Sequence, residues 1–332
     1  MKLNPDLYHG QLKETNFFEN WYFKLVDKTG AHVIVFIPGI IKSVTGEQHC
    51  FLQLINQINH STDYLRFLST AFYSNPNRLK LHLNTNIFSY EKIYVNFKTK
   101  KNIIHGILYL DQPIKWPDTK VNPGSMGIFN HFDFMDYYHH ICALDGLIEQ
   151  GHLMINGKSY DFTNGRYYIE KKWGEHLLTS WLAIQSNTFN PQHAAITVSL
   201  VPIPLPLTKD FYGFFIGLTV DNTFYSFTTL NRSKFELTIQ QNEIQMVATT
   251  SDYKLTLMTH HQVTDFHLLA IPSNINDSLP IYETLTATLT LKLEHLKQNT
   301  FIYEGIGANT SIKYAGDLHR FLNTNESTRF QT

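Results

Sequence analysis

Carboxylates next to aromatic side chains are the residues of this sequence best suited to chemistry. Glu19 shares its expected strand face with Trp21, and Glu170 lies in a segment that also contains tyrosines and a tryptophan. A carboxyl group among aromatic rings is desolvated, which raises its pKa and makes it a proton donor near neutral pH. The alternatives are a solvated Glu19 at the start of its strand and an outward Glu170 paired with Lys171 or Lys172. For Glu170, the residue type alone favours the outward salt bridge.

The densest group of titratable residues is the segment 131–140, which contains three histidines and two aspartates. His131 and Asp133 lie two residues apart, and with His139 they would supply the two-histidine and one-carboxylate set that binds iron or zinc. The alternative is that these groups hydrogen-bond to one another and to the backbone of a sheet crowded with aromatic residues. Because the spacing matches no metal-binding motif, we predict no metal and no cofactor.

Amide side chains mark a further candidate segment. Trp181, Ala183, Gln185 and Asn187 alternate along one face of an expected strand. Inward-facing amides need hydrogen-bond partners, which are either the oxygens of a ligand or neighbouring backbone groups. The sequence contains no nucleophile elbow, phosphate-binding loop, dinucleotide fingerprint or HExxH motif. Hydrolase, kinase and dehydrogenase functions therefore have no support in it.

Short strands must position these residues. Apolar and polar residues alternate strictly from Leu285 to Leu293, and Asn156-Gly157 between two apolar runs is the strongest hairpin signal. We expect a helix only near Asp317–Leu322. Roughly eighteen or more short strands are too many for one open twisted sheet, so the sequence predicts an all-β protein of closed barrels or stacked sandwiches. The length suits two such units, with a boundary near residue 165.

Composition excludes several classes of protein and of partner. Hydrophobic residues make up 43% of the 332-residue chain and charged residues 17%, which is typical of a folded protein with a large core. The net charge of -1 creates no global positive field, so we expect no nucleic-acid partner. Two cysteines and a polar N-terminus without a signal peptide favour a cytoplasmic location, and the lack of a long apolar run predicts no integral membrane association. The sequence leaves the oligomeric state open.

Several segments, taken together and in this order, resemble motifs of the tocopherol cyclase-like family. The resemblance covers mainly residues 17 to 190, and Gly316-Asp317 resembles the closing Gly-Asp of the family. The motifs are E-G-W-Y-F-K at residues 19–24, F-I-P-G-I at 36–40, P-G-x-M-G at 123–127, F-M-E-x-x-H at 134–139, G-R-G-Y-I-E-K-D/N-W-G at 165–174 and W-x-W-x-Q-x-N-x-F at 181–189. The sequence departs from the family pattern at Asn20, His140, Lys172, Leu177, Leu178 and Ala183.

The resemblance implies a fold of two lipocalin-like antiparallel β-barrels or half-barrels with few helices. Proteins with this architecture include carotenoid hydratases and some fungal ring-forming pericyclases. The number of expected strands leads independently to the same architecture. We therefore expect an N-terminal lipocalin-like barrel over residues 1–165, a C-terminal one over residues 166–325 and a short tail over residues 326–332.

The resemblance also implies a chemistry and a set of site residues. Plant members of the family close a chromanol ring by protonating a prenyl double bond and trapping the cation with a phenol oxygen. This reaction needs an acid in an apolar pocket, and aromatic faces stabilise the developing cation. The candidate acids are Glu19, Asp136 and Glu170. The residues expected to line the pocket or orient a ligand are Trp21, Tyr22, Tyr138, His139, Trp173, Trp181, Gln185 and Asn187.

Three functions follow as hypotheses. The first is an enzyme that binds a hydrophobic prenyl, isoprenoid or polyene molecule and promotes its cyclisation, hydration or isomerisation. The second is a non-catalytic lipocalin-like binder or carrier of such a molecule. The third is a structural role, in which Arg166, Glu170 and Trp173 form a packed network between the barrels. Two departures bear on the choice, because Ala183 in place of a tryptophan reshapes the pocket and Lys172 stabilises the ionised form of Glu170.

Overall fold

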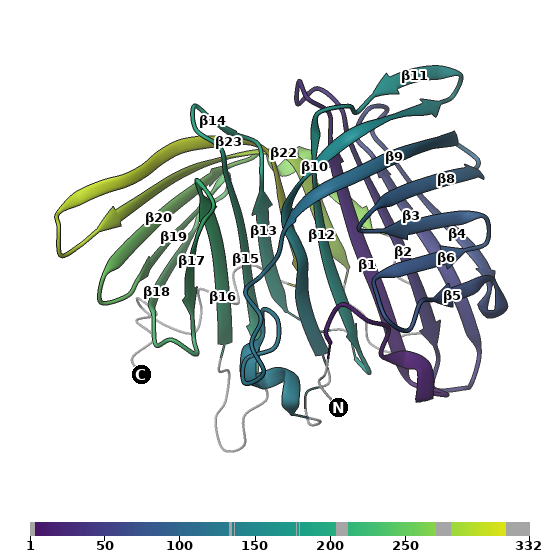
Figure 1. Ribbon diagram of the computed structural model, residues 1–332, viewed down its shortest axis with the longest axis horizontal. Coiled ribbons are helices and arrows are strands. Elements are labelled where there is room, and N and C mark those ends of the chain that lie inside the picture. The colour runs from purple at the N-terminus through teal and green to yellow at the C-terminus, as the bar shows by residue number, and fades with distance from the viewer. Residues whose placement is uncertain are drawn as a thin grey trace. The chain divides into compact units, whose positions relative to one another are not determined.

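The computed structural model describes residues 4–132, 135, 137–176, 178, 180–203, 212–269 and 280–316. These residues form two compact units, one made of the described residues up to 176 and one of those from 178 onward. Each unit contains one antiparallel β-sheet (Figure 1). β12 (Gly165–Gly174) begins at the boundary expected from the sequence and pairs with strands of the first sheet.

The first sheet has twelve strands in the order β4-β3-β2-β1-β12-β10-β9-β8-β7-β6-β5, with β11 paired to β10. Side chains from β4 and from β5, at the two ends of this order, pack against the same apolar cluster, so the sheet curls around one core. Besides β12, its strands are β1 (Phe17–Val26), β2 (Val33–Lys42), β3 (Gln48–Asn56), β4 (Ser61–Leu68), β5 (Phe72–Ser74), β6 (Lys80–Leu83), β7 (Asn86–Ser89), β8 (Lys92–Lys98), β9 (Ile103–Ile114), β10 (Tyr137–Ile155) and β11 (Lys158–Asp161).

The second sheet has eleven strands in the order β17-β16-β15-β13-β23-β22-β20-β19-β18, with β14 on β23 and β21 on β22. Phe227 of β17 and Phe235 of β18 belong to one apolar cluster, in which Phe235 also stacks on Phe214 of β16 with ring centroids 4.5 Å apart, so the two ends of this order also meet in one core. The strands are β13 (Trp181–Ser186), β14 (Phe189–Asn190), β15 (Ala194–Pro202), β16 (Tyr212–Val220), β17 (Thr223–Thr228), β18 (Lys234–Ile239), β19 (Glu243–Thr249), β20 (Tyr253–His260), β21 (His267–Leu269), β22 (Ile281–His295) and β23 (Thr300–Ala315).

The structure confirms the predicted all-β fold of antiparallel β-barrels or half-barrels with few helices. The alternating segment from Leu285 to Leu293 lies within β22, where its leucines are buried. The predicted hairpin joins β10 to β11, and both Asn156 and Gly157 have positive φ, as a two-residue hairpin turn requires. The only helices among the described residues are short 3-10 turns, and the helix expected near Asp317–Leu322 lies outside those residues. The 3-10 turns are η1 (Gly10–Leu12), η2 (Ser69–Ala71), η3 (Gly127–His131) and η4 (Val263–Asp265).

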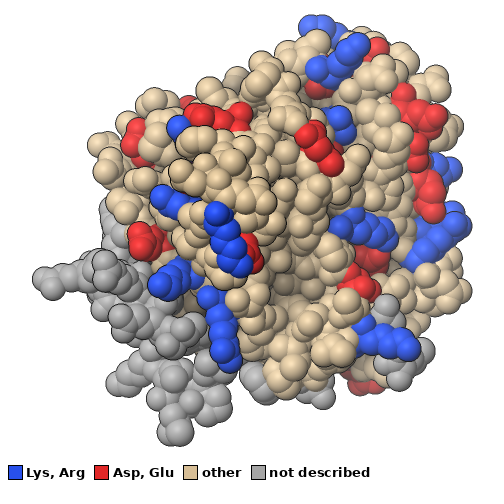
Figure 2. All heavy atoms as spheres, turned by 60° about the vertical axis from the view of Figure 1, so that its left-hand side comes forward, with Lys and Arg blue, Asp and Glu red and all other residues tan. Residues whose placement is uncertain are grey.

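Two further observations concern membrane-spanning helices and surface charge. Within the described part of the chain, no helix has the length and apolar character needed to cross a membrane. Figure 2 shows one face of the molecule, on which Lys and Arg side chains are interspersed with Asp and Glu side chains. The basic residues drawn there form no continuous patch of the kind that holds a phosphate backbone.

Candidate functional site

Three adjacent strands of the first sheet, β1, β12 and β10, carry most of the candidate residues. In the antiparallel register Glu19 lies opposite Trp173, and Tyr22 lies opposite Glu170. Residues directly opposite in a ladder share a face, and successive residues alternate between faces. Glu19 and Glu170 therefore project from opposite faces of the same sheet, and they cannot be two acids of one pocket.

Glu19 lies on the face that packs against the core, where it forms a buried ion pair. Its Oε1 is 2.6 Å from Nζ of Lys171, and neither side chain is exposed to solvent. Its Oε2 accepts hydrogen bonds from the backbone N–H of His9 at 2.9 Å and of Gly10 at 3.2 Å. Both oxygens of the Glu19 carboxyl group are therefore engaged in charge-assisted contacts.

Lys171 ties the N-terminal segment to this face. Its Nζ donates to the carbonyl of Pro5 at 3.0 Å and to the carbonyl of Leu7, and it lies 2.8 Å from Nδ1 of His9. Burial lowers the pKa of Lys171, and the charge of Glu19 opposes this shift. Burial and then the Lys171 charge lower the pKa of His9, so this imidazole stays neutral and its Nδ1 can accept a hydrogen bond from the lysine.

Aromatic rings surround the buried lysine. The ammonium lies 4.5 Å from the ring centroid of Trp173 and 5.3 Å from that of Trp21, which are cation–π distances. Trp173 stacks on His9 with ring centroids 4.4 Å apart and on Tyr138 with ring centroids 5.0 Å apart. Three of the predicted lining residues, Trp21, Tyr138 and Trp173, are thus packed around Lys171 and the N-terminal segment.

Glu170 lies on the opposite face in a second buried group. Its Oε2 accepts a hydrogen bond from the hydroxyl of Tyr168 at 2.8 Å and lies 3.0 Å from Nε2 of His139. Its Oε1 is 3.5 Å from Nζ of Lys172. Only 2% of the Glu170 side chain is exposed. Glu170 therefore does pair with Lys172, as one of the expected alternatives had it, but its expected outward position is wrong because both faces of β12 are buried. Lys171 points to the other face, towards Glu19.

Further aromatic side chains share the face of Glu170. Tyr22 meets Tyr168 edge to face with ring centroids 6.3 Å apart, and Tyr137 lies 6.2 Å from Phe18. Burial, and then the charge of Glu170, raise the pKa of Tyr137 well above its ordinary value. This phenol therefore keeps its proton across the physiological range. The arrangement places a carboxyl group, an imidazole and phenol hydroxyls in one desolvated group, which is the equipment for proton transfer.

The structure does not bring all predicted residues together. Asp136 and Asp133 lie outside the described residues, and His131 is exposed at the end of η3 whereas His139 is buried in β10. The alternative of His131, Asp133 and His139 as metal ligands therefore has one member outside the described residues and two histidines that differ in burial. Among the described residues, one group of three potential metal-ligating side chains lies close together, and it consists of Asp6, His140 and Cys142.

The amide segment belongs to the second unit. Trp181, Ala183 and Gln185 lie on one face of β13 and are buried, as the alternation predicted. Gln185 lies opposite Ser311 on one neighbouring strand and opposite Thr197 on the other. Asn187 is buried just after the strand ends. Their role as ligand-orienting residues stays a prediction.

Sequence reasoning missed Tyr168 and Tyr137 as members of the Glu170 group. Tyr168 is two residues before Glu170, so strand alternation alone would have placed it on the same face. It also missed the part played by His9, which reaches Glu19 and Lys171 from a segment without regular strand structure. No local pattern marks that contact.

Known proteins resemble the chain in sequence and in fold. The family model described as tocopherol cyclase-like matches residues 108–316, and no curated protein matches the sequence. An AttH-type protein of Nitrosomonas europaea shares 13% identity at a TM-score of 0.54, over 90% of this chain and 92% of that one. Kievitone hydratase from Nectria haematococca shares 9% identity at a TM-score of 0.50, over 94% and 93%. CghA shares 7% identity at a TM-score of 0.56, over 90% and 88%. At these identities the likeness shows the fold.

Proposed function

Because the chain belongs to the tocopherol cyclase-like family, we propose that it binds a hydrophobic prenyl, isoprenoid or polyene molecule and catalyses an acid-promoted reaction at one of its double bonds. The reaction is a cyclisation, a hydration or an isomerisation. One observation carries the proposal, namely the buried Glu170 carboxyl whose Oε2 is shared by the Tyr168 hydroxyl and the His139 imidazole.

The chemical step needs one proton from this group. The carboxylic O–H of Glu170 breaks as a C–H bond forms at one end of the double bond, which leaves a carboxylate and a carbocation. A substrate phenol or a water then forms the new C–O bond and returns its proton to the carboxylate, with His139 as the relay. The Tyr168 and Lys172 contacts stabilise the carboxylate formed on the way, and aromatic rings on this face stabilise the cation.

Glu19 has a different role in this proposal. Both of its carboxyl oxygens are engaged within the protein, Oε1 by Lys171 and Oε2 by two backbone N–H groups. It holds the N-terminal segment on the core face. Of the two candidate acids that the structure describes, Glu170 is the one whose carboxyl group contacts a phenol hydroxyl and an imidazole together.

Proteins of the same fold support this class of reaction. One is a hydratase named for kievitone, and another, CghA, has also been crystallised with the small molecule Sch210972. Both share less than a tenth of their residues with this chain, so they support ligand binding in such a fold without indicating the ligand.

A non-catalytic carrier is the second candidate function, and one contact favours it. Lys172 lies 3.5 Å from Glu170 and stabilises the ionised carboxylate, which is the wrong form for a proton donor. A carrier would bind the same apolar molecule and release it unchanged. An enzyme and a carrier would therefore both bind the apolar molecule, and only the enzyme would convert it.

The test combines ligand recovery with turnover. The purified protein is extracted for bound apolar molecules and then incubated with prenyl quinols, with products followed by mass spectrometry. We expect Glu170→Gln to lower turnover by about 10²–10⁴-fold, the usual contribution of a general acid. Glu175→Gln is the matched control, because Glu175 follows β12 directly and its side chain is 41% exposed. Equal turnover by Glu170→Gln and wild type would refute the acid role. Binding without turnover by the wild type would establish the carrier.

A further inference from the structure

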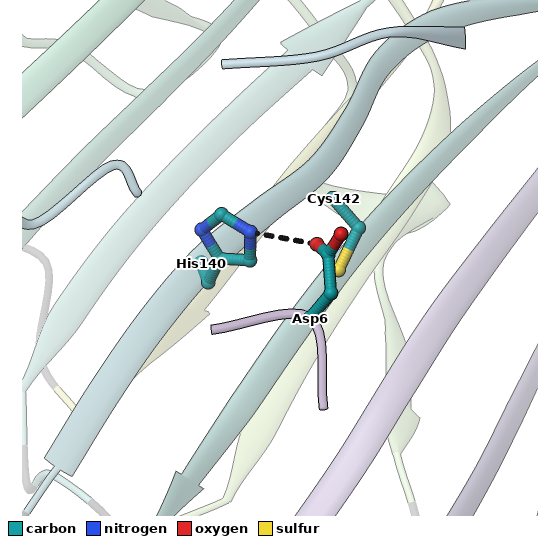
Figure 3. A group of neighbouring side chains, drawn as sticks. All are labelled: Asp6, His140 and Cys142. Atoms are coloured by element: carbon teal, nitrogen blue, oxygen red, sulfur yellow. Dashed lines mark hydrogen bonds and ion pairs between the residues drawn. The ribbon is translucent and has the colours of Figure 1, made fainter. Parts of the chain in front are cut away.

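A second group of chemically versatile side chains lies on the core face, away from Glu170. Asp6 of the N-terminal segment meets His140 and Cys142 of β10, and one ligand atom from each of the three lies within 4.8 Å of the others (Figure 3). Nε2 of His140 is 3.0 Å from Oδ1 of Asp6. His140 and Cys142 are buried, and Asp6 is 15% exposed.

The strand is irregular where it presents this group. In the ladder with β12, Ile141 pairs with Glu170 and Ala143 pairs with Ile169, so Cys142 is an extra residue at a β-bulge. Bulges re-aim side chains and occur often beside functional sites. His140 and Cys142 are also two residues apart, which is the spacing of neighbours on one strand face.

The geometry does not fit a Cys–His–Asp nucleophile. Such a relay needs the two ring nitrogens of the histidine to face the carboxylate and the thiol separately. Here Nδ1 of His140 lies beside Gly124, where a Cβ atom would come within 2.5 Å of it. Figure 3 shows the Cys142 sulfur next to the Asp6 carboxylate, on the side of the ring that carries Nε2. All three ligand atoms therefore converge on one small space.

We propose that Asp6, His140 and Cys142 bind a divalent cation of the zinc type, with one coordination position left open. Thiolate, imidazole and carboxylate together are the ligand types of Zn²⁺, and three protein ligands are typical of zinc sites that accept a further molecule. A tetrahedral Zn²⁺ separates its ligand atoms by about 3.5 Å, so the group closes on the ion through shifts of about 1 Å.

The surroundings provide room and leave the ligands available. A cavity of about 400 Å³ is lined by all three residues and has space for a water or another ligand at the open position. Lys115 binds the other carboxylate oxygen of Asp6, Oδ2, at 3.0 Å, and Oδ1 would exchange its contact with His140 for the ion. The Lys115 ammonium also lies 3.9 Å above the ring of Tyr90, so its charge is shared between Asp6 and an aromatic face.

Cobalt reports on this site directly, because Co²⁺ replaces Zn²⁺ and a thiolate ligand gives it a charge-transfer band in the near ultraviolet. We expect one equivalent of Co²⁺ to produce this band in the full-length protein and Zn²⁺ to remove it. Cys142→Ser should abolish the band. Cys50→Ser is the matched control, because Cys50 is the other buried free cysteine of the same core and lies outside the cluster.

Asp6→Asn keeps the proposal testable if Cys142→Ser fails to fold, because Asp6 lies in the N-terminal segment before the first strand. We expect this variant to bind Co²⁺ at least about tenfold more weakly. Four results would each overturn the proposed site. The wild-type protein could lack the band, or the band could survive Cys142→Ser. The band could also be lost in Cys50→Ser, or the Co²⁺ affinity could be unchanged in Asp6→Asn. None of these readouts depends on turnover at Glu170.

Discussion

Replacing Lys171 with methionine tests the account of the core face most directly. Methionine keeps the length of the apolar stem and removes only the charge. The change leaves Glu19 ionised and fully buried, with only the N–H groups of His9 and Gly10 as strong partners. It also leaves the carbonyls of Pro5 and Leu7 without their ammonium donor.

The expected loss of unfolding free energy is about 4 kcal/mol, because removing one partner of a buried ion pair costs about 3–5 kcal/mol. The double variant Glu19→Gln/Lys171→Met removes both charges and should be more stable than Lys171→Met alone, since no unpaired charge remains buried. Lys13→Met is the control, because the ion pair of Lys13 with Glu175 is at the surface and is worth about 0–1 kcal/mol.

Urea unfolding followed by tryptophan fluorescence measures these differences. Trp21 and Trp173 contact the ammonium of Lys171, so their fluorescence follows the unfolding of the first unit from rings next to the substituted side chain. At a slope of about 2 kcal/mol per molar urea, the loss in Lys171→Met corresponds to a midpoint lower by about 2 M. A midpoint shift in Lys171→Met no larger than that in Lys13→Met would contradict a stabilising buried ion pair. So would a double variant less stable than Lys171→Met.

The remaining predictions concern acid stability and packing. Burial would raise the pKa of Asp27, but hydrogen bonds from His32 and a neighbouring threonine outweigh it and hold the pKa below 3.8. Asp27 therefore stabilises the fold above this pH and loses its contribution as the pH falls through its folded pKa, so Asp27→Asn should flatten the loss of stability measured between about pH 5 and pH 2. In Gly106→Ala the new Cβ would lie 2.2 Å from the backbone oxygen of His152, and we expect thermal unfolding to show a loss of about 1–3 kcal/mol. His105→Ala, at an exposed position on the same strand, should lose less than Gly106→Ala; an equal loss would contradict the steric argument.

Much of the local arrangement of the site followed from the sequence. The alternation in residues 19–24 placed Glu19 with Trp21 on one face and Tyr22 on the other, and the register of β1 with β12 confirms this. The same rule applied to β12 separates Lys171 from Glu170. What the pattern could not provide was burial, because exposure depends on what packs against a face. This is why the solvated Glu170 expected from its residue type was wrong.

The order of residues was enough to predict that the chain forms strands, where a hairpin turns and which residues share a face. These are local properties, because an extended backbone alternates its side chains with a period of two whatever surrounds it. The motifs along the strands were also sufficient to indicate the family. The pairing of Glu19 with Lys171 and the contact of Glu170 with His139 arise only when the strands are assembled. The contact of Asp6 with His140, across 134 positions of sequence, also arises only in the folded protein. These contacts depend on the register between strands and on the path of an N-terminal segment outside the sheet, and neither is written in any local pattern of residues.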